Sequence, residues 1–219
     1  NPFWKSHFLG GFFLAGGFLL ALGGAYLALG IFESENRFDL RMAGKFMVTA
    51  LAVSLLEEWI FRGLLLDAVL RSSRTFIALF FVTFFFALVH FLKPPGIIDL
   101  NDADVKITTG FWMVGQIFIH FGNPVFIAAE FATLFAVGWV LGWARLRTSS
   151  LWLGIGLHSG WVFSYELYRY HTFMPKRYSA ELFLPYIGTD LKSGLIPLAI
   201  VCLTGVVSAI WLYSRHRRH

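Results

Sequence analysis

The chain has 219 residues, of which 57% are hydrophobic and 14% are charged. A typical soluble domain carries about 25% charged residues, and a protein of this size has too small an interior to bury so much apolar surface. The composition therefore excludes soluble, disordered, collagen-like and disulfide-stabilised proteins and indicates an integral membrane protein. The net charge of +5 does not indicate nucleic-acid binding here, because lysine and arginine also mark the cytoplasmic side of membrane proteins.

Six apolar segments between charged residues each approach the roughly 20 residues needed to cross a bilayer core. They cover residues 8–32, 44–70, 76–92, 124–144, 150–169 and 194–213. The prolines lie between these segments or at their edges, as expected for residues that interrupt helices. We therefore predict one all-α membrane domain over residues 1–219, a polytopic bundle of about six transmembrane helices.

Arginines follow the second, fourth and sixth segments, within residues 71–74, 145–147 and 215–218. An even number of crossings places these three clusters on one side of the membrane, which the positive-inside rule makes the cytoplasmic side. We therefore expect a multi-pass protein of a prokaryotic inner membrane, with both termini in the cytoplasm. On the opposite side, the apolar patch from Phe111 to Phe121 is too short to span and is predicted to form an interfacial or re-entrant helix.

The first segment is rich in glycine, and two series of glycines recur in it every seven residues. These series are Gly10, Gly17 and Gly24, and Gly16, Gly23 and Gly30. A stripe of small residues lets another helix approach closely, so we interpret it as a packing surface for a neighbouring helix.

Ionisable side chains inside the apolar segments are few, and each costs several kcal/mol in hydrocarbon, which makes them candidates for function. They are Glu57, Glu58, Arg62, His90, Glu130, His158 and Glu166. Counted at about 1.5 Å per residue from the nearest arginine cluster, four of them lie at similar depths of about 17 to 24 Å. These four are Glu57, His90, Glu130 and His158. Four segments thus contribute polar residues to one layer of the membrane.

Glu57 and Glu58 are consecutive and therefore project about 100° apart on a helix, which suggests different tasks. Arg62 follows Glu58 at the i, i+4 spacing that lets a carboxylate and a guanidinium meet. Glu57 faces elsewhere, where it can act as a general base. The alternative is that all three residues only hold helices together.

The two histidines also have structural alternatives. His90 ends an apolar run and can be an interface residue, whereas His158 lies in the glycine-rich stretch 154–160 and can belong to a helix-packing motif. Their shared depth favours a common site. Glu130 is a candidate to support that site from behind, and Glu166 is expected near its outer rim.

Three motifs resemble those of the CPBP family, which contains CAAX proteases and bacteriocin-processing membrane proteins. Residues 57–62 (EEWIFR) look like its EExxxR signature, residues 86–90 (FALVH) resemble its FxxxH signature, and residues 138–158 are similar to its last motif. The similarity covers about residues 45 to 165. It implies an intramembrane endopeptidase similar to type II CAAX prenyl endopeptidases, which hydrolyses a membrane-embedded or membrane-tethered protein or peptide without a cofactor.

The resemblance implies roles for individual residues. Glu57 takes a proton from water, His90 binds or polarises that water, and His158 faces the carbonyl oxygen, while Glu58 and Arg62 position Glu57. The family normally has Asn or Asp four residues after the last histidine, where this chain has Val162. The site then lacks the polar group that this residue supplies in the family, or another residue supplies it. Ser159 and Asn123 are the candidates.

Two other functions remain open on the sequence alone. Glu57, His90 and His158 have the residue types of a catalytic zinc site, although the HExxH motif is absent. Val162 favours a weakly active or inactive family member that serves as a binding, immunity or scaffolding protein. A proton-coupled carrier is disfavoured because the sequence shows no inverted repeats.

Overall fold

A computed structural model describes residues 2–35, 38–91, 109, 124–178 and 180–216. It contains the long helices α1 (Trp4–Ala28), α2 (Leu40–Glu58), α4 (Thr75–Phe91), α6 (Pro124–Thr148), α7 (Trp152–His171) and α9 (Leu195–His216). The π-helical turn η1 (Trp59–Leu65) and α3 (Leu66–Leu70) continue α2, and α8 (Ala180–Phe183) is a single short turn. The strands β1 (Glu33–Ser34) and β2 (Thr172–Phe173) form one antiparallel pair.

The predicted helical membrane bundle is confirmed, because each of the six predicted segments coincides with a long helix or, for residues 44–70, with α2, η1 and α3 in succession. Among the described residues, three helices are long and apolar enough to cross a membrane: Trp4–Ala28, Ile127–Thr148 and Leu195–Ser214. The helix at Thr75–His90 is apolar but shorter. The patch from Phe111 to Phe121 lies outside the described residues.

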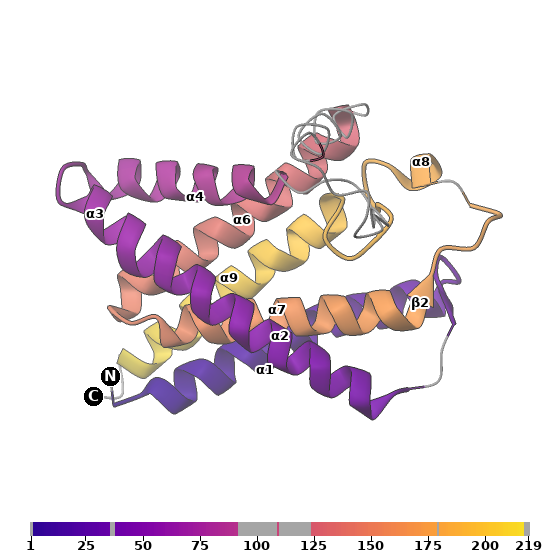
Figure 1. Cartoon of the computed structure of the whole chain (residues 1–219), viewed down its shortest axis with the longest axis horizontal. Helices are drawn as coiled ribbons and strands as arrows, with labels where there is room; N and C mark the ends of the chain where they lie inside the picture. Colours follow the sequence, from indigo (N-terminus) through magenta and orange to yellow (C-terminus); the bar gives the residue numbers. More distant parts are fainter. Residues whose placement is uncertain (1, 36–37, 92–108, 110–123, 179, 217–219) are drawn as a thin grey trace.

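The start of α1 and the end of α9 lie at the same end of the molecule (Figure 1). A short turn joins α3 to α4, and from there α2 and α4 separate along their lengths (Figure 1). α7 lies in the middle of the bundle, where it packs against α1, α2 and α6, and α6 also packs against α4 and α9. The space between the diverging α2 and α4 is therefore backed by α6 and α7.

Close packing between α1 and α7 depends on glycines of both helices. A Cβ atom at Gly11 would lie 2.9 Å from the backbone nitrogen of Leu157, and one at Gly156 would overlap the carbonyl of Phe8. Of the two glycine series in the sequence, Gly16 and Gly23 face α7 and Gly10 faces Trp211. A Cβ atom added at Gly17, Gly24 or Gly30 would meet no atom of the described residues within 4 Å. The predicted packing surface is thus confirmed for part of the stripe only.

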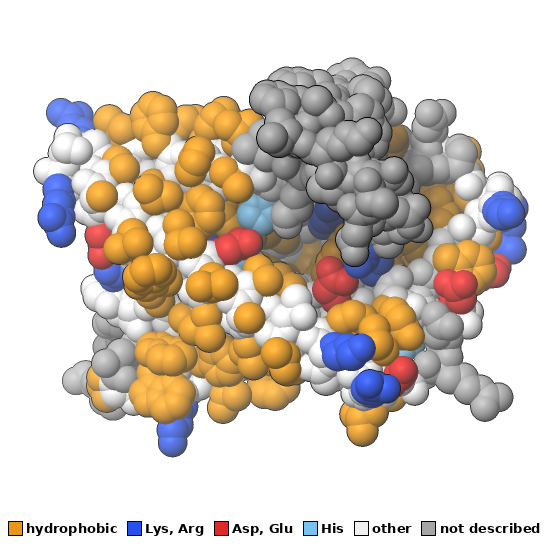
Figure 2. Space-filling model, in the orientation of Figure 1, with side chains coloured by type: hydrophobic (Ala, Val, Ile, Leu, Met, Phe, Trp, Pro, Cys, Tyr) orange, Lys and Arg blue, Asp and Glu red, His pale blue; other side chains and the backbone are white. Residues whose placement is uncertain are grey.

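The outer surface of the bundle is largely apolar. Figure 2 shows hydrophobic side chains over most of the face formed by α2 and α4, with lysines and arginines toward its edges. Large side chains such as Phe76, Phe81, Phe85 and Leu56 are exposed there. Such continuous exposed apolar surface fits contact with lipid. Acidic, basic and histidine side chains lie in the middle of the same face (Figure 2).

Candidate active site

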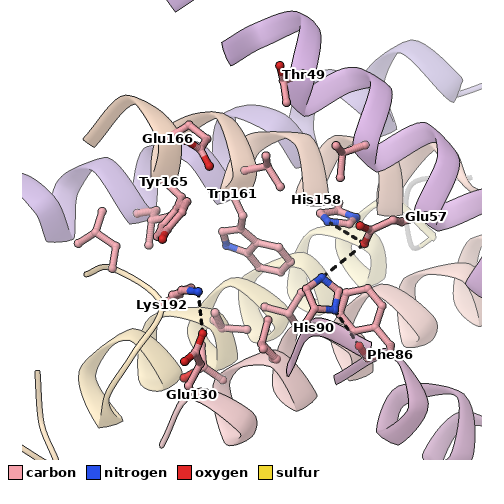
Figure 3. Close-up of a pocket in the computed structure, with 18 residues that line it drawn as sticks. Thr49, Glu57, Phe86, His90, Glu130, His158, Trp161, Tyr165, Glu166 and Lys192 are labelled. Carbon is pink, nitrogen blue, oxygen red and sulfur yellow. Dashed lines mark hydrogen bonds and ion pairs between the residues drawn. The ribbon is translucent and has the colours of Figure 1, made fainter. Parts of the chain in front are cut away.

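A cavity of about 380 Å³ lies between α2, α4, α6 and α7. Its wall is mostly apolar, with two groups of polar side chains at separate places (Figure 3). The lining residues are Leu19, Thr49, Val53, Glu57, Phe86, His90, Glu130, Thr133, Leu134, Val137, His158, Trp161, Val162, Tyr165, Glu166, Leu191, Lys192 and Val201. The cavity therefore contains the four residues that the depth count predicted to share one layer of the membrane.

The first polar group consists of Glu57, His90 and His158, which come from three helices and point toward one another (Figure 3). Glu57 Oε2 lies 3.6 Å from Nε2 of His90 and 3.8 Å from Nε2 of His158. Both separations exceed the length of a direct hydrogen bond. Glu57 Oε2 is buried without a hydrogen-bond partner among the described residues. The three side chains thus bring an unpaired carboxylate oxygen and two imidazole nitrogens together at one place in the cavity wall.

The second ring nitrogen of each histidine is hydrogen-bonded. His90 Nδ1 lies 2.7 Å from the carbonyl oxygen of Phe86, one turn earlier on α4. Because a carbonyl only accepts, Nδ1 carries the hydrogen, and in the neutral ring Nε2 is an acceptor that faces Glu57. His158 Nδ1 lies 3.1 Å from Glu58 Oε1, which orients its ring in the same way.

Glu58 and Arg62 form a buried ion pair behind His158. Arg62 Nη1 donates to Glu58 Oε1 at 2.8 Å, and Nη2 donates to the carbonyl of Gly138 at 3.0 Å. The guanidinium also lies 4.4 Å from the ring centre of Phe86. The predicted pairing of Glu58 with Arg62 is therefore present, but the carboxylate holds His158 rather than Glu57.

Glycine and the π-helical turn make room for this pair. Glu58 ends α2 and Arg62 lies within η1, so the chain changes its helical repeat between the two residues. A Cβ atom at Gly154 would lie 2.9 Å from Glu58 Oε2, so any larger residue would displace the carboxylate. Single π-helical turns inside α-helices occur frequently at functional sites.

The second polar group lies at the other end of the cavity. Lys192 Nζ lies 2.6 Å from Glu130 Oε1, and Asp190 closes the loop that carries Lys192 by accepting hydrogen bonds from Tyr165 and from Ser193. Burial lowers the pKa of Lys192, but the neighbouring carboxylates of Asp190 and Glu130 raise it above its ordinary value. Glu130 therefore pairs with a cation instead of supporting the group around Glu57.

The remaining predicted residues lie outside the group around Glu57. Ser159 donates to the carbonyls of Ile155 and Gly156 on its own helix, so its hydroxyl does not reach the cavity. Glu166 lines the cavity and pairs with Arg169 at 3.0 Å. Val162 lines the cavity as well, and Asn123 lies outside the described residues.

Sequence reasoning did not single out Trp161, Tyr165 or Lys192. Trp161 and Tyr165 follow His158 by three and seven residues, the spacing of one helix face, so the position of His158 could have indicated them. Lys192 lies in a loop between α8 and α9, and no periodicity marks it.

A helical bundle with an apolar surface that holds two glutamates, two histidines and an arginine beside one cavity is the architecture of a membrane-embedded enzyme. A family model described as Type II CAAX prenyl endopeptidase Rce1-like matches residues 40–164, more than half of the chain, and the chain belongs to this family. The predicted resemblance is thus confirmed, and the protein is an integral membrane protein of a membrane endopeptidase family. No curated protein and no solved structure matches the chain.

Proposed function

We propose that the protein is an intramembrane endopeptidase in which Glu57 activates a water molecule for attack on a peptide bond. The observation that carries this proposal is the convergence of Glu57, His90 and His158, with Glu57 Oε2 3.6 Å and 3.8 Å from the two Nε2 atoms. A carboxylate and an imidazole acceptor on either side of one water can receive both of its hydrogens, which leaves an oxygen lone pair for attack.

In the proposed reaction, Glu57 takes a proton from the water while the oxygen forms a bond to the carbonyl carbon. His158, in its doubly protonated form between the carboxylates of Glu57 and Glu58, donates from Nε2 to the carbonyl oxygen as negative charge develops. Glu57 then passes its proton to the amide nitrogen as the carbon–nitrogen bond breaks. The products are a new carboxyl terminus and a new amine, with no covalent intermediate.

Glu58 and Arg62 act as positioning residues in this mechanism. Glu58 is fully buried and accepts from both Arg62 and His158, so it fixes the ring orientation of His158. Arg62 in turn is held by the carbonyl of Gly138. A preorganised ring needs no rearrangement at the moment of reaction, which is the main advantage of such a site over water.

We propose a membrane-embedded or membrane-tethered peptide as the substrate, which reaches the cavity from the bilayer. The mostly apolar cavity wall and the polar side chains exposed in the middle of an apolar face support this route (Figure 2).

We also propose that the end of the molecule where α1 begins faces the cytoplasm. The arginine-rich connection between α3 and α4 and the end of α6 lie at that end (Figure 1), and the positive-inside rule places such arginines in the cytoplasm.

Purified protein in liposomes should cleave a fluorescent peptide that ends in a prenylated CAAX sequence, and mass spectrometry should identify one cleavage site. Because the proposed mechanism uses no metal ion, EDTA and 1,10-phenanthroline should leave the rate unchanged. Loss of activity on chelation, with one zinc per protein by elemental analysis, would favour the zinc site instead. Binding of the peptide without cleavage would favour a non-proteolytic role.

A further inference from the structure

Trp161 lines the cavity and carries a buried hydrogen-bond donor. Its side chain is 6% exposed, and it lines the cavity on the face of α7 that also carries His158. Its Nε1–H has no acceptor among the described residues. Buried tryptophan N–H groups usually have a partner, and an orphan donor in a native structure calls for an explanation.

The polar groups near Trp161 do not supply that partner. Figure 3 shows the indole between the group around Glu57 and the Lys192–Glu130 pair, with its nitrogen on the side of Lys192. Neither Glu130, which accepts from Lys192, nor the hydroxyl of Tyr165, which donates to Asp190, accepts from Trp161 Nε1–H. Leu134, Val137 and Val201 also line the cavity, and their side chains cannot accept a hydrogen bond.

Val162, the next residue of α7, also lines the cavity and offers no hydrogen-bond donor. It stands at the position where the family normally has Asn or Asp. Consecutive residues of a helix project about 100° apart, so Trp161 does not occupy the place of that side chain. Trp161 is a separate lining residue, and its Nε1–H has no acceptor among the described residues.

We propose that Trp161 Nε1–H donates a hydrogen bond to a backbone carbonyl of the bound peptide, between the scissile bond and the Lys192–Glu130 pair. This inference rests on the proposed function, since it supplies that site with a residue that binds substrate. An N–H group binds only hydrogen-bond acceptors. An extended peptide offers one such acceptor, its backbone carbonyl, per residue, at a rise of about 3.3 Å per residue. In a mostly apolar cavity, one such bond sets which peptide bond faces Glu57.

Replacement of Trp161 by Phe tests the contact because it removes the N–H and keeps an aromatic ring. We expect kcat/KM for the prenylated peptide to fall about tenfold, mainly through KM, because one neutral hydrogen bond to substrate is lost. The thermal unfolding temperature in detergent is measured alongside, because Trp161 belongs to the hydrophobic core and the variant also removes buried ring volume. The matched control is Trp143→Phe, a partly buried tryptophan packed against the core and away from the cavity, which should leave KM unchanged.

Equal KM values for the wild type and Trp161→Phe would overturn the inference. An equal rise in KM for Trp143→Phe would also overturn it, because that result indicates a general effect of packing. If the wild type cleaves the peptide and Trp161→Phe behaves like it, only this inference fails. If the wild type does not cleave the peptide, the proposed function fails, and a binding measurement still tests the contact.

That binding measurement uses the Glu57→Gln protein labelled with ¹⁵N at the indole nitrogens. The signal of Trp161 is the one that disappears in the Glu57→Gln/Trp161→Phe protein. Addition of the prenylated peptide should move the proton of this signal downfield, as expected when an N–H group gains an acceptor, while the signal of Trp143 stays in place. A bound peptide that leaves the Trp161 signal unmoved would contradict the inference.

Discussion

Replacement of Glu57 by Gln should lower kcat for cleavage of the prenylated peptide by about 10²- to 10⁴-fold, the range that a general base contributes. The amide keeps the size of the side chain but cannot take a proton from water. Because Glu57 is partly exposed and its contacts with His90 and His158 are long, at 3.6 Å and 3.8 Å, the effect on folding should be small. The measurement is initial rates in liposomes, together with the unfolding temperature of each protein.

The matched control for this variant is Glu166→Gln. Glu166 lines the same cavity, but it pairs with the exposed Arg169 and lies outside the group around Glu57. Its replacement should change kcat less than about twofold, since an exposed ion pair contributes little. Equal rates for the wild type and Glu57→Gln would remove Glu57 from the mechanism.

Replacement of Arg62 by Met should destabilise the protein by about 3–5 kcal/mol, the cost of leaving a buried charge without its partner. Glu58 and Arg62 are almost completely buried, and the guanidinium also holds the carbonyl of Gly138. Activity should fall as well, because the carboxylate that orients His158 loses its support. Thermal or denaturant unfolding in detergent measures the first effect, and cleavage rates measure the second.

Two further variants distinguish the effect of burial on stability from the effect of removing a charge. Arg145→Met breaks an ion pair with Asp67 at 3.0 Å in which both side chains are partly exposed, so it should cost less than about 1 kcal/mol. The double variant Glu58→Gln/Arg62→Met should recover part of the stability lost by Arg62→Met, because it leaves no buried charge. If Arg62→Met and Arg145→Met were equally stable, the ion pair behind His158 would have no structural importance.

The positions of the helices and the convergence of Glu57, His90 and His158 could be predicted from the sequence. Apolar segments between charges correspond to α1, α4, α6, α7 and α9, because hydrocarbon forces the chain to satisfy its backbone within helices. Counting residues from the arginines placed Glu57, His90 and His158 in one layer, since the rise of a helix is fixed. No pattern in the sequence predicted the π-helical turn η1.

Residue counting predicts how deep a side chain lies in the membrane but not its position within the membrane plane. Contacts that depend on how the helices pack could therefore not be predicted from the sequence. Residue counting predicted the same depth for Glu130 as for Glu57, but Glu130 pairs with Lys192 at the other end of the cavity. Glu58 was expected to position Glu57, whereas its second partner is His158, a contact that depends on how α2 packs against α7. The absence of a side chain at Gly154 permits that contact, and its effect appears only once both helices are in place.

The central claim, direct attack by a water that Glu57 activates, is tested most directly by one turnover in H₂¹⁸O with hydroxylamine present. The mechanism predicts one ¹⁸O atom in the new carboxyl terminus of the cleaved peptide, no label in Glu57 and no hydroxamate product. A peptide hydroxamate, or ¹⁸O in the side chain of Glu57, would reveal a covalent acyl-enzyme and contradict the mechanism.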